Sequence, residues 1–140
     1  MGDYAELHCR SNFSFLYGAS HPEQLVESAV RNNLSALAIT DRNGFYGVVK
    51  FAQAARSLNL PTLFGVELSC ANSLNTGSVG GAPVDGDDDD RIVLIAAGPA
   101  GYSRLARAIT LGQLAGAKSA PVFETAKVAE TVGDTCWVLT

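Results

Sequence analysis

The sequence predicts a mixed α/β fold in which short buried strands alternate with amphipathic helices. Short apolar runs, such as residues 36–40, are typical of strands that are covered on both faces. The segments between them repeat apolar residues at helical spacing, as in residues 48–58. This alternation predicts right-handed crossovers and therefore a parallel sheet or a partial (β/α) barrel, with about five parallel-type strands.

The first half of the chain holds three of the predicted strands and two helices. A helix is expected to begin in Ser20-His21-Pro22-Glu23, because Ser20 can cap it and Glu23 occupies the reciprocal capping-box position. Proline is tolerated in the first turn of a helix. The predicted strands are residues 4–8, 36–40 and 62–68, and the second predicted helix is 48–58.

Residues 70–90 interrupt this pattern. They are rich in Gly, Ser, Asn and Asp, which predicts a flexible acidic surface loop. The Asp87 to Asp90 run lacks the spacing of a calcium-binding EF-hand and is interpreted as a solvated acidic tip. Beyond the loop, strands are predicted at 91–97 and 136–140, a turn at 98–101, and helices at 102–114 and 125–132.

Composition and charge exclude several classes of protein. The chain has 140 residues, 47% of them hydrophobic, which is enough apolar surface to fold. Its net charge of −4 argues against a self-sufficient nucleic-acid binder, although not against a module of a larger enzyme. The N-terminus does not resemble a signal peptide, and no apolar run is long enough to span a membrane. Three widely spaced cysteines predict neither a disulfide framework nor a CxxC zinc site, so we expect a reduced, cytoplasmic protein.

Metal-capable side chains end three successive predicted strands. His8, Asp41 and Glu67 close the first, second and third strand, and parallel strands bring such ends to one edge, here called the rim. An imidazole and two carboxylates suit zinc, manganese or iron. The alternative is structural: Asp41 caps a turn, Glu67 is a surface carboxylate and His8 is a satisfied core histidine. The spacing alone leaves both interpretations open.

Four blocks of the sequence resemble, in the family's order, the PHP domain (polymerase and histidinol phosphatase). They are LHCRSNFSFLYGASHPEQL, ALAITDRNGFYG, LPTLFGVELS and LIAAGPAGYSRLARAITLGQLAG. The blocks are similar to the form at the N-terminus of bacterial C-family DNA polymerases, the polymerase III alpha subunits. SNFSFL, GASHPE and ITDRNGFYGVVKFAQAAR are most similar to the error-prone, damage-inducible branch.

The resemblance implies a distorted (β/α)7 barrel with a metal cluster at its rim, which hydrolyses phosphoesters in active members. Residues 1–140 would be the N-terminal part of a PHP domain, with the polymerase palm, fingers and later domains absent. The implied partner is the remainder of the polymerase chain. DNA would be bound only through the parent enzyme, and no membrane is involved.

Three ligand positions of the resembling family depart from its pattern. The His-x-His motif is His8-Cys9-Arg10, and the Thr-Asp-His motif is Thr40-Asp41-Arg42. A carboxylate that usually precedes Gly-Ala is replaced by Tyr17. A guanidinium stays protonated and has no lone pair to give a metal. These departures predict that the cluster has degenerated.

The resemblance also assigns roles to the rim residues. His8 and Glu67 match ligand positions and are expected to be the remnant of the metal site, with Asp41 beside a ligand as a second-shell residue. Arg10 and Arg42 are expected to take the metal's place and pair with Asp41 and Glu67. No metal is then expected to be bound, although zinc, manganese or magnesium at low occupancy stays possible.

The sequence leaves three candidate functions, of which the first two are the main alternatives. The first is a structural PHP module of an error-prone DNA polymerase, which serves translesion repair in the parent and cannot polymerise DNA by itself. The second is a free-standing metal-dependent phosphoesterase of the histidinol-phosphatase type, favoured by His8, Asp41 and Glu67. The third is an interaction domain unrelated to polymerases. Phe13, Phe15 and Tyr17 are expected to pack under the barrel mouth, the alternative being base stacking.

Overall fold

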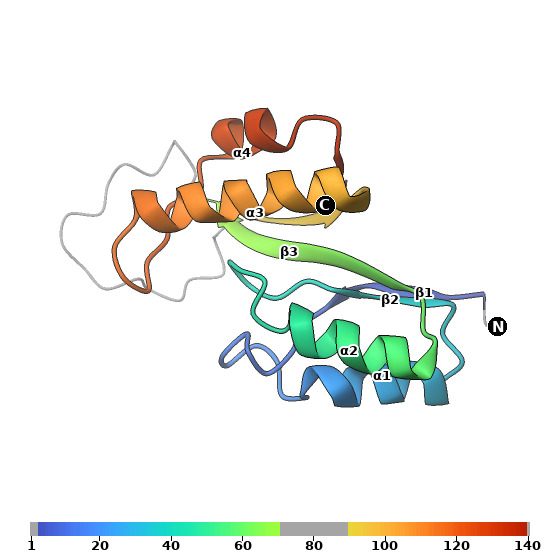
Figure 1. Ribbon diagram of the computed structural model, residues 1–140. Coiled ribbons are helices and arrows are strands. Elements are labelled where there is room, and N and C mark those ends of the chain that lie inside the picture. Colours follow the sequence, from blue (N-terminus) through green and yellow to red (C-terminus); the bar gives the residue numbers. More distant parts are fainter. Residues whose placement is uncertain (1–2, 71–89, 140) are drawn as a thin grey trace.

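The computed structural model describes residues 3–70 and 90–139 (Figure 1). Its strands are β1 (Ala5–Cys9), β2 (Ala36–Ile39), β3 (Thr62–Cys70), β4 (Asp90–Ala96) and β5 (Cys136–Leu139). Its helices are α1 (Pro22–Arg31), α2 (Val48–Leu58), α3 (Gly98–Ala115) and α4 (Thr125–Val132). The five strands form one curled sheet in the order β1-β2-β3-β4-β5, which confirms the partial-barrel α/β fold.

The direction of two strands corrects the prediction. β1, β2 and β3 are parallel, as expected, but β4 is antiparallel to β3, and β5 is antiparallel to β4. The prediction of five parallel-type strands was therefore wrong for β4 and β5. For β5 the reason is the pair of helices before it: α3 and α4 run in opposite directions and return the chain to the end of β4 (Figure 1). The Ala97 N–H accordingly donates to the Thr135 carbonyl at 2.9 Å.

β3 changes partners along its length. Its first residues, Thr62 to Phe64, pair with β2, and from Gly65 onward the strand pairs with β4. A Cβ atom on Gly65 would lie 2.5 Å from the Leu94 carbonyl oxygen, so only glycine allows this close approach of the two backbones. β3 thus joins a parallel half of the sheet to an antiparallel half.

Each half has its own apolar core. α1 and α2 cover the parallel half, and α3 and α4 cover the antiparallel half (Figure 1). The first core centres on Phe51, Ile39 and Val26, and the second on Phe123, Leu94 and Leu105. Phe45 packs against both cores and stacks on Tyr102 with ring centroids 4.6 Å apart. The two cores therefore meet at this aromatic pair.

Two helix starts differ from the sequence prediction. α1 begins one residue later than expected: His21 is the N-cap residue, and its N–H donates to Gln24 Oε1 at 2.9 Å, so neither Ser20 nor Glu23 forms the capping box. The predicted turn at 98–101 is instead the first turn of α3, where Pro99 needs no intrahelical N–H bond.

The predicted loop at 70–90 lies mostly outside the described residues, since only Cys70 and Asp90 belong to strands. Among the helices of residues 3–70 and 90–139, none is long and apolar enough to cross a membrane.

Candidate functional site

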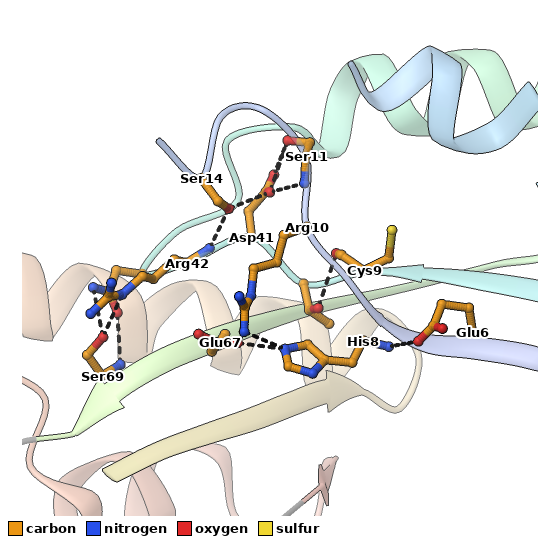
Figure 2. Close-up of polar contacts among 12 residues, drawn as sticks. Glu6, His8, Cys9, Arg10, Ser11, Ser14, Asp41, Arg42, Glu67 and Ser69 are labelled. Atoms are coloured by element: carbon orange, nitrogen blue, oxygen red, sulfur yellow. Dashed lines mark hydrogen bonds and ion pairs between the residues drawn. The ribbon is translucent and has the colours of Figure 1, made fainter. Parts of the chain in front are cut away.

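The five residues proposed for the rim lie near one another in the fold. His8 belongs to β1, Arg10 follows that strand, and Glu67 lies within β3. Asp41 and Arg42 follow β2, and Arg42 forms a parallel bridge with Glu67. The parallel pairing of β1, β2 and β3 causes this gathering, because it brings their carboxyl ends to the same edge (Figure 2).

Glu67 is the buried centre of the site. Its side chain is 1% exposed, and its Oε2 atom accepts hydrogen bonds from the Arg10 guanidinium, through Nε at 2.9 Å and through Nη2. His8 Nε2 lies 2.6 Å from the same oxygen and 3.3 Å from Arg10 Nη2 (Figure 2). Oε1 has no hydrogen-bond partner among the described residues. The Arg10 guanidinium therefore contacts His8 Nε2 and Glu67 Oε2, the atoms through which these two side chains were expected to bind a metal.

The electrostatics of this cluster depend on Arg10. A buried carboxylate is costly unless it is paired, and an arginine is always charged in a protein. The Arg10 side chain is itself 23% exposed, so its end is only partly desolvated. A buried pair of this kind adds little net stability compared with an apolar pair, but the loss of one partner is expensive. The buried negative charge of Glu67 is thus compensated mainly by Arg10.

Asp41 has a different role from the one expected. It is buried and accepts hydrogen bonds from the Ser11 N–H and hydroxyl, from the Ser14 hydroxyl and from the Gly47 N–H, at 2.8 to 3.0 Å. Gly47 is the N-cap of α2, so the carboxylate also lies at the positive end of a helix dipole. Both oxygens are used in fixing the chain after β1 to the start of α2.

Arg42 does not pair with the rim carboxylates. Its Nε donates to Ser69 Oγ at 3.0 Å and its backbone N–H donates to Ser14 Oγ at 3.0 Å. The ion pairs between described residues include none between Arg42 and Asp41 or Glu67. The predicted pairing is therefore wrong for Arg42, because its side chain extends along β3 toward Ser69 (Figure 2). For Arg10 the expected contact with Glu67 is present.

Tyr17 stands where the resembling family usually has a carboxylate, and three guanidinium groups surround its ring. Arg42 lies 4.3 Å from the ring centroid, Arg91 lies 5.6 Å away and Arg10 lies 5.9 Å away. Cations are attracted to the negative face of an aromatic ring. The ring therefore helps to hold several like charges in a small volume.

The side chains at the rim do not fit a metal cluster. Among the described residues, no group of three or more His, Cys, Asp and Glu side chains is placed to hold an ion. His8 Nε2 and Glu67 Oε2 face each other, and both contact the Arg10 guanidinium. Both oxygens of Asp41 accept hydrogen bonds. A guanidinium in contact with both potential ligands would repel a divalent cation. The unpartnered Oε1 of Glu67 is one available donor atom, too few for a cluster.

Cys9, which follows His8 in β1, is an inert thiol. Burial, together with the nearby carboxylates of Glu6 and Asp41, raises its pKa to about 11. The thiolate is the reactive form of cysteine, so a raised pKa suppresses nucleophilic chemistry.

Sequence reasoning missed several residues of the site. Ser11 and Ser14 fix Asp41, and Arg91 contacts Tyr17 from β4. The Ser-x-x-Ser spacing before a turn was a weak signal for a pair of hydroxyls. Nothing in the sequence indicated that Arg91 belongs to the site, because its place beside Tyr17 depends on the antiparallel pairing of β4 with β3.

The fold and the rim residues together define the class. The family model of the PHP domain matches residues 6–135, and the chain belongs to this family.

Within that family the chain is similar to error-prone DNA polymerases. It is 44% identical over 138 residues to the enzyme of Mycolicibacterium paratuberculosis and 45% identical over 138 residues to that of Cutibacterium acnes. These alignments cover 98% and 97% of this chain but only 12% of each relative. The matched region is the N-terminal one. The resemblance to the error-prone branch seen in the sequence blocks is therefore confirmed.

Solved structures support the fold. A protein of Bifidobacterium adolescentis, described as a metal-dependent phosphoesterase, aligns with a TM-score of 0.56 and 20% identity over 81% of this chain and 35% of that one. An amidohydrolase of Chromobacterium violaceum, solved with sulfate and no metal, aligns with a TM-score of 0.57 and 25% identity over 79% of this chain and 33% of that one.

Proposed function

We propose that this chain serves as the PHP module of an error-prone DNA polymerase, in which Arg10 replaces the charge of the lost metal cluster. The observation that carries the proposal is the guanidinium of Arg10, which contacts the buried Glu67 carboxylate and lies 3.3 Å from His8 Nε2. The pocket keeps a positive charge beside Glu67 and has no Lewis acid. The module is then a structural element, and its phosphoesterase chemistry is lost.

The relatives support the wider context. They are whole error-prone DNA polymerases, and this chain matches about an eighth of their length, as the 12% coverage shows. The partner of the module is then the remainder of such a polymerase chain, and DNA synthesis belongs to domains outside these residues. Residues 1–140 would form the N-terminal part of the PHP domain in that enzyme.

One observation favours a metal-dependent phosphoesterase instead. His8 and Glu67 are both retained, and Glu67 Oε1 has no partner among the described residues. A single ion held by these two side chains would have to displace Arg10. The competing function therefore makes a distinct prediction about metal content.

Metal analysis of the purified chain tests the proposal. After incubation with zinc or manganese and dialysis, we expect less than one tenth of an equivalent to remain, and no hydrolysis of p-nitrophenyl phosphate or of a 3′ DNA end above the blank. Glu67→Gln is the informative variant, and Glu130→Gln, an exposed carboxylate on α4, is its control. Near-stoichiometric metal together with hydrolysis above the blank, both lost in Glu67→Gln but kept in Glu130→Gln, would favour the phosphoesterase instead.

A further inference from the structure

Large aromatic side chains are exposed both beside the rim and elsewhere on the surface. Phe15 is 79% exposed and Phe13 is 42% exposed, while Tyr17 is half-buried, so the expectation that these rings pack under the barrel mouth is wrong for the two phenylalanines. Trp137 in β5 is 58% exposed and borders a groove of about 640 Å³, which no rim residue lines. A volume of this size is within the range of binding pockets.

The groove exists because β3 lacks a helix of its own. α1 packs on α2 and α3 packs on α4, but α2 and α3 stand apart with β3 between them (Figure 1). Parallel strands are joined by a crossover that is usually a helix, whereas antiparallel neighbours such as β3 and β4 need none. No described helix lies between these two strands in the chain. One position in the layer of helices is therefore left open.

The first residues of β3 line this groove. Thr62, Leu63 and Phe64 are half-buried, although the next four residues of the strand are all buried. The Phe64 ring makes edge-to-face contacts with Phe51 and with Tyr102, and its centroid lies 6.1 Å from each of theirs. These contacts fix the ring in the folded chain, so the groove is already formed before anything binds in it. A preformed site loses little side-chain entropy on binding.

The side chains of the walls select an uncharged, apolar occupant. Aliphatic surface comes from Val48, Ala96 and Pro99, and aromatic surface comes from Tyr102 and Trp137. Among the described residues that line the groove there is no lysine, arginine, aspartate or glutamate. A charged group buried here would have no partner of opposite charge, and its burial would be costly. Tryptophan and tyrosine are the residues that most often carry binding energy in interfaces between polypeptides.

We propose that the groove binds the apolar face of a helix from the remainder of the polymerase chain. The inference rests on the proposed function, which makes this chain a module of such an enzyme. The alignments cover only 12% of the relatives, so most of their length is available to supply the helix. A helix suits the open position between α2 and α3, and it presents apolar side chains to a groove at i, i+3 and i+4 spacing.

Thiol labelling of a Ser103→Cys variant tests this. Ser103 is exposed on α3 and lines the groove, and Thr110→Cys, which is exposed further along the same helix and outside the groove, is the matched control. Both variants are compared in the 140-residue chain and in the error-prone polymerase of Mycolicibacterium paratuberculosis, with this chain in place of its matched N-terminal region. DNA synthesis by each polymerase variant shows that it is folded.

The two positions should respond differently to the rest of the polymerase. N-ethylmaleimide, followed by mass spectrometry of the modified peptide, should label Ser103→Cys about 10-fold more slowly in the polymerase than in the 140-residue chain, because a packed interface excludes water and reagent. Thr110→Cys should change by less than about twofold, because its thiol stays in solvent.

Photo-crosslinking identifies the occupant. The photoreactive residue p-azidophenylalanine in place of Tyr102 keeps a ring in the groove wall, and in the polymerase it should crosslink to a segment of the same chain, beyond the matched region, with apolar residues at helical spacing. Equal labelling of Ser103→Cys in both proteins, or equal protection of Thr110→Cys, would overturn the inference. So would a crosslink to a second copy, to another protein or to a segment of alternating apolar spacing. Protection without any crosslinked peptide would indicate a small molecule and would overturn it too.

Failure of this inference can be distinguished from failure of the proposed function. Metal content and hydrolysis are measured on the 140-residue chain alone, so an empty groove in the polymerase leaves the outcome of that test unchanged.

Discussion

Replacement of Arg10 by alanine tests the electrostatic basis of the rim. Glu67 is 1% exposed when Arg10 is in place, and the change leaves only His8 Nε2 within hydrogen-bond distance of its carboxylate. The loss of one partner from a buried ion pair costs about 3–5 kcal/mol. Arg10 is 23% exposed and His8 stays in place, so we expect a loss at or just below the low end of that range, about 2–3 kcal/mol in the free energy of unfolding.

Urea unfolding at pH 7, followed by far-UV circular dichroism, measures this loss. With a slope of about 2 kcal/mol per molar urea, the midpoint should fall by roughly 1–1.5 M, while the slope itself stays unchanged. Lys127→Ala is the matched control, because it removes an exposed ion pair to Glu124 with a 2.7 Å separation. That variant should lose less than about 0.5 kcal/mol.

A double-mutant cycle makes the result specific. Glu67→Gln removes the charge that Arg10 compensates, so the double variant should be more stable than the sum of the two single losses predicts, by about 1 kcal/mol or more. If Arg10→Ala costs no more than Lys127→Ala, or if the two losses at the rim simply add, Arg10 does not compensate the buried carboxylate and the reasoning fails.

Three further predictions concern the residues around the rim. Asp41→Asn sets an amide N–H against either the Ser11 or the Gly47 donor, and should cost about 2–4 kcal/mol in urea unfolding and reduce amide protection at that residue; unchanged protection at both would contradict the role of Asp41. Gly47→Ala places a Cβ 2.6 Å from Asp41 Oδ2, so it should destabilise the fold by more than Gly98→Ala, which meets no atom within 4 Å and carries only the strain of φ +76°. Cys9, with its pKa raised to about 11, should react with a disulfide reagent at pH 8 only after unfolding. The thiol ionises at a lower pH in the unfolded chain than in the folded one. Its contribution to the free energy of unfolding is therefore full below pH 9 and is lost as the pH rises toward 11. A Cys9→Ser variant should not show this loss.

The sequence predicted those elements whose signals are local. The helices 48–58 and 125–132 agree with α2 and α4 residue for residue, because their apolar spacing and end residues determine them. The directions of β4 and β5 were missed. For β5 the reason is that an alternating order of strands and helices does not reveal that α3 and α4 act as a pair. Local residues likewise could not show whether Ser20 or His21 caps α1, because the choice depends on where the preceding chain is anchored.

For the rim, too, some contacts were predicted correctly and others were not. The resemblance placed His8, Arg10 and Glu67 together, and the structure brings all three into contact. It failed for Arg42, whose direction along β3 is set by Ser69, a residue two positions beyond Glu67 on the same strand. Arg91 could not be foreseen, because its approach to Tyr17 requires the tertiary pairing of β3 and β4.

The change of partners along β3 bears on how the molecule comes apart. Only three residue pairs join β2 to β3 within the strands, whereas six join β3 to β4. The parallel and antiparallel halves are thus two potential units of local unfolding, and the seam between them is narrow. Glu67 crosses that seam with its backbone, donating to the Asp41 carbonyl at 3.1 Å and accepting from the Asn43 N–H at 2.8 Å, and with its carboxylate on Arg10. Because Arg10 follows β1 and its guanidinium bonds Glu67 on β3, this pair also links the two halves, and its loss is expected to let them unfold separately.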